Sequence, residues 1–316
     1  MSRPFATIDI GTNSVLLLIA LTPVPSPVYG RGELGVRADL ARITGLGKKL
    51  SKTFHPESKE RTLQALQEYA SLCRDASVQK VVCVGTAAFR KAADGPQFME
   101  EIGRRFGWET RIISGEEEAR LSFLSVERDF GSQHKNLIAL DIGGGSTEII
   151  SEEGGVSLEL GTVVLTEKYL RQDPPTEGEF KDVIHVIKSK IPPNPPLTKG
   201  GRGDLIALAG TVTTLSSVNQ HLERWDPEKI QGSIITLSEL ESMITLFRRT
   251  TNEERRAIPG MIHGREETIL AGSLILKAVM EKLGVQEVIV SDRGLRYGLF
   301  YDHFGFIGSS RRLRVL

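Results

Sequence analysis

Hydrophobic and polar positions alternate along the chain in a pattern that predicts short strands followed by helices. Apolar runs of strand length predict strands at 5–8, 15–21, 80–84 and 110–113. Helical spacing predicts a helix over 56–74 and another through Phe106, broken near 94–96. Elements in this order predict an α/β fold, with a mixed sheet and helices on its faces.

The second half of the chain repeats this plan. Strands are expected at 137–140, 147–150, 158–165, 204–209 and 287–290. Helices are expected over 166–170, 177–190, 237–249 and 266–283, and a further one starts at 210–211. Gly284 is expected to end the long helix before it.

The repeated plan predicts two similar domains, and 316 residues are enough for both. We place them at 1–119 and 120–296, with the segment from about 297 to 316 as a candidate to pack back on the first. Residues 191–203 interrupt the second domain with four prolines and three glycines. Such a composition does not form a packed element, so we expect a flexible insertion there.

One hexapeptide pattern, Asp-Ile-Gly-x-x-Ser, occurs at residues 9–14 and again at 141–146, each time between two expected strands. Small residues let phosphate oxygens approach the backbone N–H groups of such a hairpin. The candidate phosphate-binding residues are therefore Gly11, Thr12, Asn13, Ser14, Gly143, Gly144, Gly145 and Ser146. Asp9 and Asp141, at the ends of buried strands, are candidate metal ligands. Plain hairpin turns use the same residue types, but the shared pattern with matched flanking strands favours phosphate binding.

Two glutamates are candidates for the chemistry itself. Ser114 and Glu117 have the spacing of a helix-capping box, and acids in a first helical turn interact favourably with the helix dipole. These two effects explain Glu116 and Glu117 but do not require Glu118. The carboxylate of Glu118 is therefore a candidate general base for an attacking water. Glu148 is a candidate to join Asp141 in orienting a magnesium ion or that water; its alternative is a solvated strand residue.

Further candidates follow two of the expected buried strands. Gly85-Thr86 and Gly210-Thr211 each lead from a strand into a helix, where backbone N–H groups can bind an anion, although plain turns would look the same. Arg90 is either a phosphate clamp or a lone surface arginine. The remaining basic candidates either supply local positive charge to the site or, as we favour, belong to a solvated face: Lys48, Lys49, Lys52, Arg293 and Arg296.

Composition bears on the class of protein but does not identify its binding partner. Lys+Arg and Asp+Glu number 40 each, so net charge argues neither for nor against an anionic partner, and we expect no DNA partner. No apolar stretch approaches membrane-spanning length, and the first strand leaves no room for a signal peptide. We therefore expect a soluble cytoplasmic protein with no membrane partner. Cys73 and Cys83 fit no metal or disulfide pattern and are expected in the core.

Together these motifs resemble the exopolyphosphatase/guanosine pentaphosphate phosphohydrolase (Ppx/GppA) family. The resemblance runs through both hexapeptides, the latter extended to Glu148, and through Gly85-Thr86 with Arg90. It continues through 114–120, 159–163, 210–211, 259–260 and 291–296, and so covers almost the whole chain.

The resemblance implies an actin-like (ribonuclease H-like) fold in both domains, with the active site in an interdomain cleft. It implies hydrolysis of the terminal phosphoanhydride of inorganic polyphosphate or guanosine pentaphosphate, with Glu118 as the base. Asp141 and Glu148 would take metal- and water-orienting roles, with magnesium or another divalent cation as cofactor. By analogy a homodimer is plausible. We do not expect the helical C-terminal region of longer members, and Arg265-Glu266-Glu267 stands where many members have Arg-Ala-Asp.

Two other functions are compatible with these residues. One is an ATP-dependent kinase of the same fold that phosphorylates a small molecule. The other is a non-catalytic nucleotide or polyphosphate sensor. A base candidate at Glu118 favours hydrolysis over both.

Overall fold

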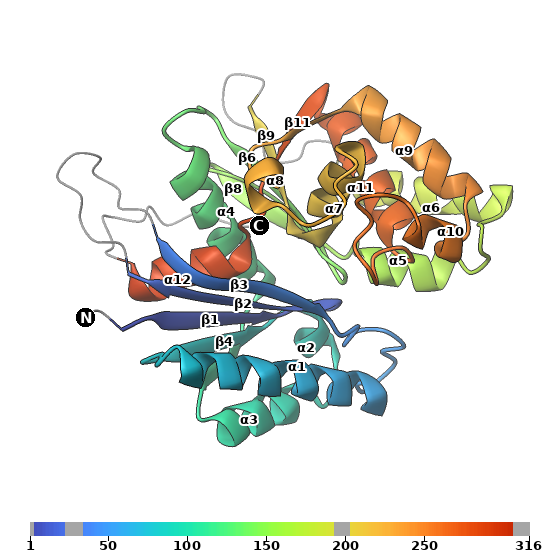
Figure 1. Cartoon of the computed structure of the whole chain (residues 1–316). Helices are drawn as coiled ribbons and strands as arrows, with labels where there is room; N and C mark the ends of the chain where they lie inside the picture. The colour runs from blue at the N-terminus through green and yellow to red at the C-terminus, as the bar shows by residue number, and fades with distance from the viewer. Residues whose placement is uncertain (1–2, 23–33, 193–202, 306–316) are drawn as a thin grey trace. The chain divides into compact units, whose positions relative to one another are not determined.

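The computed structural model describes residues 3–22, 34–192 and 203–305 (Figure 1). Contacts between Cα atoms group these residues into two compact units. Unit 1 contains the described residues up to Ser125 and those from Leu295 onward, and unit 2 runs from Val126 to Gly294. Most of the insertion expected at 191–203 lies outside the described residues.

Unit 1 is built on a five-stranded sheet in the order β3-β2-β1-β4-β5. Its strands are β1 Phe5–Ile10, β2 Ser14–Leu21, β3 Gly35–Ile43, β4 Val81–Gly85 and β5 Glu109–Ile112. Neighbours among β1, β2 and β3 are antiparallel, whereas β1, β4 and β5 run parallel. The carboxyl ends of these three parallel strands therefore lie at one edge of the sheet, where ligands commonly bind in α/β folds.

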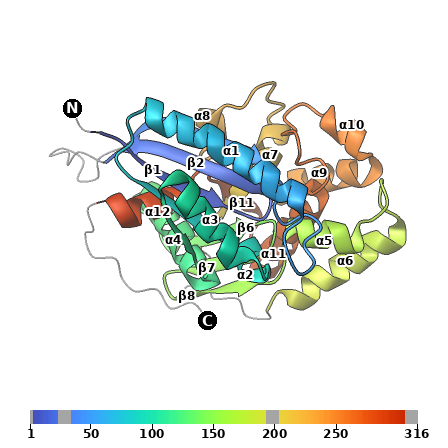
Figure 2. The same ribbon diagram turned by 90° about the horizontal axis from the view of Figure 1, so that it is seen from below.

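Helices cover both faces of this sheet. They are α1 Pro56–Asp75, α2 Ala87–Lys91, α3 Gly95–Phe106, α4 Gly115–Phe130 and α12 Leu295–Phe304. α1 and α3 lie together on one face (Figure 2), in a core that includes Ile8 and Cys83. α4 and α12 pack on the other face, where Leu121 and Leu299 meet Val82. Because side chains alternate along a strand, Asp9 lies on this second face.

Unit 2 repeats the same strand order and adds one edge strand. Its sheet has the order β10-β11-β9-β6-β7-β8. The strands are β6 Ile138–Ile142, β7 Thr147–Ser151, β8 Gly154–Leu158, β9 Leu205–Leu208, β10 Ile234–Thr236 and β11 Glu287–Val290. The antiparallel set β6-β7-β8 corresponds to β1-β2-β3, and the parallel strands β9 and β11 correspond to β4 and β5. The prediction of two similar α/β domains is confirmed.

The described residues of unit 2 form seven helices, three of which begin at a capping box that is local in sequence. They are α5 Thr162–Tyr169, α6 Glu177–Lys190, α7 Ala209–Asn219, α8 Pro227–Ile230, α9 Leu237–Arg249, α10 Asn252–Arg256 and α11 Ile269–Leu283. α6, α9 and α10 each start with a capping box, at Thr176, Thr236 and Thr251. The bounds predicted for α6 and α9 are confirmed, and Gly284 ends α11 in the left-handed region, with φ 65°.

The segment 158–165 was predicted as a strand, and this prediction is wrong. β8 ends at Leu158, and α5 begins at Thr162. The backbone N–H of Thr162 donates to the Gly143 carbonyl at 3.0 Å, and that of Val163 donates to Gly144 at 3.0 Å. These hydrogen bonds to a distant loop replace the strand ladder that the apolar residues would otherwise favour.

Three edge strands were not predicted: β3, β10 and, apart from Leu158, β8. β3 pairs with β2 along its length, but most of its residues are exposed or only half-buried, so its hydrophobic signal is weak. The long helix also starts later than the predicted Glu266. The carboxylate of Glu266 instead accepts hydrogen bonds from the Gly264 N–H at 2.5 Å and from Arg256 at 2.8 Å, in the turn before α11.

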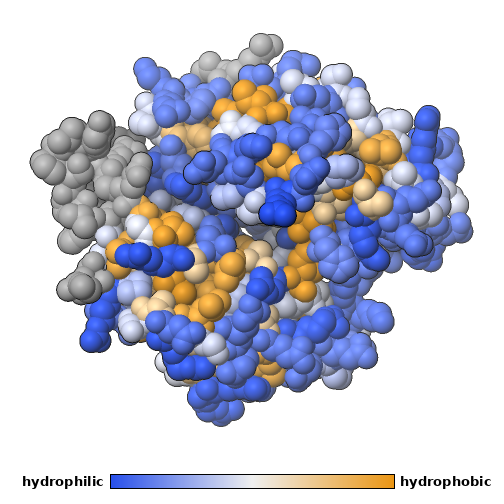
Figure 3. Space-filling view, viewed as in Figure 1, coloured by the Kyte–Doolittle hydropathy of each residue, from blue (hydrophilic) through white to orange (hydrophobic). Residues whose placement is uncertain are grey.

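Hydrophilic residues predominate on the face shown in Figure 3. Among the described residues, the exposed large hydrophobic side chains are scattered over different elements: Val36, Val164, Trp225, Ile234 and Leu246. Within the described ranges, none of the helices combines the length and the apolar character that crossing a membrane requires.

Candidate functional site

In unit 1, three of the predicted segments lie at the carboxyl ends of neighbouring parallel strands. The hexapeptide loop follows β1, Gly85-Thr86 ends β4, and the segment leading to Glu118 follows β5. The Thr86 N–H donates to the Ile10 carbonyl at 3.3 Å, which joins the first two segments. The structure therefore brings the unit 1 candidates together at one edge of the sheet.

The loop Gly11–Ser14 is held by hydrogen bonds to its carbonyl groups. Gly47 donates to the Thr12 carbonyl at 2.7 Å, and Thr44 and Gly45 both donate to Asn13 at 3.0 Å. Since a trans peptide points its C=O and the following N–H in opposite directions, the N–H groups of Asn13 and Ser14 point away from this supporting segment. The loop therefore directs successive N–H donors to one side, as an anion site requires.

The side chain of Asn13 is buried. Only 3% of the residue is exposed, yet within the described ranges neither Oδ1 nor Nδ2 forms a hydrogen bond. A buried polar group that lacks a partner costs about 1–3 kcal/mol, so the arrangement favours a ligand that supplies one.

Arg90 and Glu118 meet in the structure. Arg90 Nη1 donates to Glu118 Oε2 at 2.8 Å and to the Ile113 carbonyl at 2.9 Å. Arg90 is therefore not a lone surface arginine. The neighbouring Glu117 pairs with Arg111 at 2.5 Å, and its N–H donates to Ser114 Oγ at 3.1 Å. The helix-capping interpretation is thus supported for Glu117, while Glu118 lies in a separate ion pair.

Unit 2 has the equivalent arrangement. The second hexapeptide loop follows β6, Gly210-Thr211 follows β9, and Ser291-Asp292 follows β11, all at one edge of the parallel strands. The Gly143 N–H donates to the Ser146 carbonyl at 3.0 Å, as Gly11 does to Ser14 at 2.9 Å. The two hexapeptides therefore form the same hairpin.

The loop Gly143–Ser146 is held from the start of α5. Because Thr162 and Val163 bind the carbonyls of Gly143 and Gly144, the N–H groups of Gly144 and Gly145 point away from α5. Gly161 makes this approach possible, since a Cβ there would lie 2.5 Å from the carbonyl carbons of both Gly144 and Gly145. A Cβ on Gly47 would likewise collide with the methyl group of Thr12 in unit 1.

Asp141 and Glu148 lie directly opposite each other on β6 and β7. Both are buried, and Ser157 on β8 donates to Glu148 Oε1 at 2.7 Å. Glu148 is only 1% exposed, so its alternative interpretation as a solvated strand residue is wrong. In unit 1 the residue opposite Asp9 is Leu16, so only unit 2 has the acid pair.

The acid pair limits the kind of metal site that is possible. Within residues 3–22, 34–192 and 203–305, no group of three or more His, Cys, Asp or Glu side chains could hold a metal ion. A metal ion here would depend on one or two carboxylates together with phosphate oxygens and water. This is the usual environment of Mg²⁺ in phosphate-binding proteins, so the residues fit that ion.

The turn after β9 is strained and close to an arginine. Ala209 has φ 71°, which is rare for a residue with a side chain and is often found at functional sites. Gly210 leaves room for the Arg265 guanidinium, whose pKa burial lowers to about 10. Thr211 packs its methyl group towards Gly272 of α11. The turn therefore lies beside a positive charge at the N-terminus of α7, and any Thr211 contribution would come through its backbone.

Arg293 and Arg296 were interpreted as solvated, which is wrong for Arg296. Its side chain is 11% exposed and forms two hydrogen bonds to Asp39, at 2.6 and 2.8 Å. Arg293 pairs with Asp129 at 3.2 Å. These arginines are engaged in structural ion pairs.

Cys73 and Cys83 are free thiols in the core of unit 1, as predicted. Burial raises the pKa of the Cys73 thiol to about 12 and also raises that of Cys83. Neither thiol is suited to nucleophilic chemistry.

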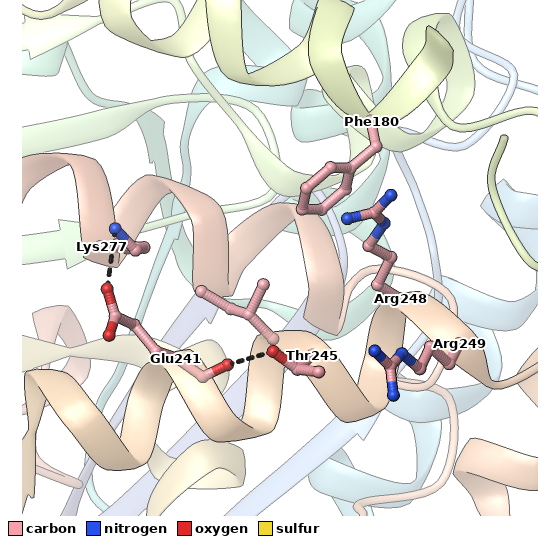
Figure 4. A pocket seen from close by; sticks show the side chains of 7 residues that line it. Phe180, Glu241, Thr245, Arg248, Arg249 and Lys277 are labelled. Carbon is pink, nitrogen blue, oxygen red and sulfur yellow. Dashed lines mark hydrogen bonds and ion pairs between the residues drawn. The ribbon is translucent and has the colours of Figure 1, made fainter. Parts of the chain in front are cut away.

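A cavity of about 410 Å³ lies between α6, α9 and α11 (Figure 4). Arg248 stacks on Phe180 with 4.2 Å between its Cζ and the ring centroid, and Lys277 pairs with Glu241 at 3.1 Å. None of the residues predicted from sequence lines this cavity. We therefore do not include it in the candidate site.

Sequence reasoning missed two supporting glycines, Gly47 and Gly161. Gly161 belongs to one of the motifs that carry the resemblance, but its role depends on a loop that is distant in sequence. Gly47 had no signal beyond the Gly-x-Gly at 45–47.

Comparison with known proteins gives a consistent result. Residues 39–305 match the model of the Ppx/GppA phosphatase family. Exopolyphosphatase 2 of Mycobacterium tuberculosis is 32% identical over 312 residues, covering 93% of this chain and 96% of that protein. A guanosine-5'-triphosphate,3'-diphosphate pyrophosphatase of Photobacterium profundum is 29% identical over 96% of this chain and 59% of its own length. The structure of the Aquifex aeolicus PPX-GPPA enzyme superposes with a TM-score of 0.78 at 31% identity, covering 96% of this chain and all of that one.

Proposed function

Because the chain belongs to the Ppx/GppA phosphatase family, we propose that it hydrolyses the terminal phosphoanhydride of inorganic polyphosphate, guanosine pentaphosphate or both. The similarity to proteins named for both activities supports a hydrolase over a kinase or a non-catalytic sensor. The observation that carries the proposal is the doubled loop, whose carbonyls are held in each unit by donors from a supporting segment. By peptide geometry the N–H groups of Asn13 and Ser14, and of Gly144 and Gly145, then point away from that segment.

We assign the loops to the oxygens of the substrate phosphates. Attack of water on the terminal phosphorus spreads negative charge over its equatorial oxygens, and backbone N–H donors stabilise that charge. The buried amide of Asn13 can add one further donor. Losing one such donor typically slows a reaction about 10²- to 10³-fold.

Glu118 is the residue that we assign to the attacking water. It accepts one proton from the water as the new P–O bond forms, and the bond from phosphorus to the bridging oxygen breaks. The leaving group is the shortened phosphate chain, or guanosine tetraphosphate, and orthophosphate is released. A carboxylate in this role is worth about 10²- to 10⁴-fold in rate.

We assign Asp141 and Glu148 to magnesium or another divalent cation, with Asp9 as a further candidate ligand in unit 1. When bound, the ion would neutralise charge on the phosphate oxygens. Ser157 holds one oxygen of Glu148, which fixes the direction of the carboxylate.

The test of the proposed function is release of orthophosphate, measured in parallel from long polyphosphate and from guanosine pentaphosphate with added magnesium. We expect release from at least one, and the ratio of kcat/KM values identifies the preferred substrate. No release from either would contradict the proposal. ATP-dependent phosphorylation of a metabolite, or tight binding without turnover, would then favour the kinase or the sensor.

Substitution of the acid pair should change the dependence on metal. We expect Glu148→Gln to raise the magnesium concentration for half-maximal activity by about tenfold or more, because it removes one of two facing carboxylates. The measurement is a magnesium titration of the initial rate.

Glu152→Gln is the matched control for this titration, because Glu152 is an exposed residue just beyond β7. It should leave the titration unchanged. An unchanged titration in Glu148→Gln would remove Glu148 from the metal site.

A further inference from the structure

Arg90 and Glu118 form an ion pair, although the proposed hydrolysis requires each of them to interact with a different partner. A phosphate clamp must bind the substrate anion, whereas a general base must offer its carboxylate oxygen to water. In the structure Arg90 Nη1 lies 2.8 Å from Glu118 Oε2, so each group is occupied by the other. This pairing depends on tertiary structure, since the two residues follow different strands.

From this geometry we propose that the pair is a substrate-operated switch, an inference that rests on the proposed function. The terminal phosphate takes the Arg90 guanidinium from Glu118, and the released carboxylate oxygen then accepts the proton of the attacking water. Arg90 thus holds the base until the phosphate site is filled. No covalent step is added to the hydrolysis.

Three features of Arg90 favour this exchange. Arg90 Nη1 donates both to Glu118 Oε2 and to the Ile113 carbonyl, so this one nitrogen is shared between two acceptors. A phosphate can accept two parallel hydrogen bonds from one guanidinium and carries more negative charge than a carboxylate. The Arg90 side chain is 26% exposed, whereas that of Glu118 is 12% exposed, so an incoming anion can reach the guanidinium.

The position of Arg90 places it near the loop that we assign to phosphate. Its N–H donates to the Thr86 carbonyl at 3.1 Å, one helical turn into α2. Thr86 is in turn bonded to Ile10, directly before the loop Gly11–Ser14. The hydrogen bond from Arg90 to the Ile113 carbonyl provides an anchor about which the guanidinium can change partners.

The neighbouring pair of Arg111 and Glu117 serves as an internal control. It has the same chemistry, with 35% and 30% exposed side chains, and Glu117 is adjacent to Glu118 on the same helix. Arg111 lies within β5, before the carboxyl edge where the loops gather. Breaking this pair should therefore not change anion binding.

The experiment is a double-mutant cycle of sulfate binding, measured by calorimetry on the full chain. Sulfate is a tetrahedral anion that cannot be hydrolysed. We expect Glu118→Gln to bind sulfate about three- to tenfold more tightly than the unsubstituted protein, because Arg90 no longer has to leave a carboxylate. In the Arg90→Gln background, Glu118→Gln should leave the sulfate affinity almost unchanged. Glu117→Gln should leave it unchanged whether or not Arg90 is present.

Each other outcome overturns the switch. An equal gain in both backgrounds would mean that Glu118 only repels the anion. No gain, or no sulfate binding by any of the proteins, would mean that Arg90 is not exchanged between the carboxylate and a tetrahedral anion. Phosphate release is assayed separately. If the protein hydrolyses its substrate but sulfate affinity rises equally in both backgrounds, only the switch is refuted. If the protein releases no phosphate, the proposed function is refuted.

Discussion

The variant Glu118→Gln should keep its fold and lose about 10²- to 10⁴-fold of the rate of phosphate release. The amide has the same shape but cannot accept a proton from water, so the loss should appear in kcat. The carboxylate does not bind the substrate in our proposal, so the substrate should still bind at least as well. The measurement is the initial rate of orthophosphate release under saturating substrate, with circular dichroism to check the fold.

Glu117→Gln is the matched control for this prediction. It removes a carboxylate from the same turn of α4 and breaks an ion pair with Arg111, but it leaves the proposed base in place. We expect a rate within about twofold of the unsubstituted protein, as for most partly exposed ion pairs. If both variants turned over normally, Glu118 would be a structural residue of the helix start and the base would have to be sought elsewhere.

Gly161→Ala should reduce both stability and activity. The backbone of Gly161 has φ −123° and ψ 150°, which alanine adopts readily, so conformational freedom is not the reason. The added Cβ would instead lie 2.5 Å from the carbonyl carbons of Gly144 and Gly145. These are backbone atoms, so the whole glycine loop must move. Overpacking of this kind typically destabilises a protein by about 1–3 kcal/mol.

The same movement should lower the rate of phosphate release by about 10²-fold, because displacement of positioned donors by about 1 Å is enough for such a loss. Chemical denaturation measures the stability, and the initial rate measures the activity. The matched control is Gly178→Ala in α6, where an added Cβ meets nothing within 4 Å. It should be neutral or slightly stabilising, by up to about 1 kcal/mol. Full activity in Gly161→Ala would show that the support from α5 does not position the loop.

Much of the fold could be predicted because its signals are local. Apolar periodicity predicted the bounds of α6 and α9, which the structure shows to begin at capping boxes, and the glycine after α11 marked its end. The repeated hexapeptide predicted two similar domains, which the two matching strand orders confirm. Local signals failed at 158–165, where hydrogen bonds to a distant loop changed a strand-like segment into the start of α5.

The candidate site could be predicted as a set of residues but not as a set of contacts. Three consecutive glutamates precede Ala119, and the sequence cannot show which arginine each one meets. The structure pairs Glu117 with Arg111 and Glu118 with Arg90, because successive helical residues point in directions about 100° apart and the arginines lie on different elements. Arg90 and Glu118, which the sequence presented as two separate candidates for a phosphate clamp and a general base, therefore form one ion pair.

By itself the sequence determined the duplicated α/β plan, the two hairpin loops and the identity of their acids, because these depend on turn chemistry and on the order of residues within one element. Only the tertiary structure decided that Gly47 and Gly161 hold the loops and that Arg90 holds Glu118. It also showed that Arg296 is buried against Asp39. Each of these contacts joins elements that are separate in sequence, and their approach is set by the packing of the helices and loops on the sheets.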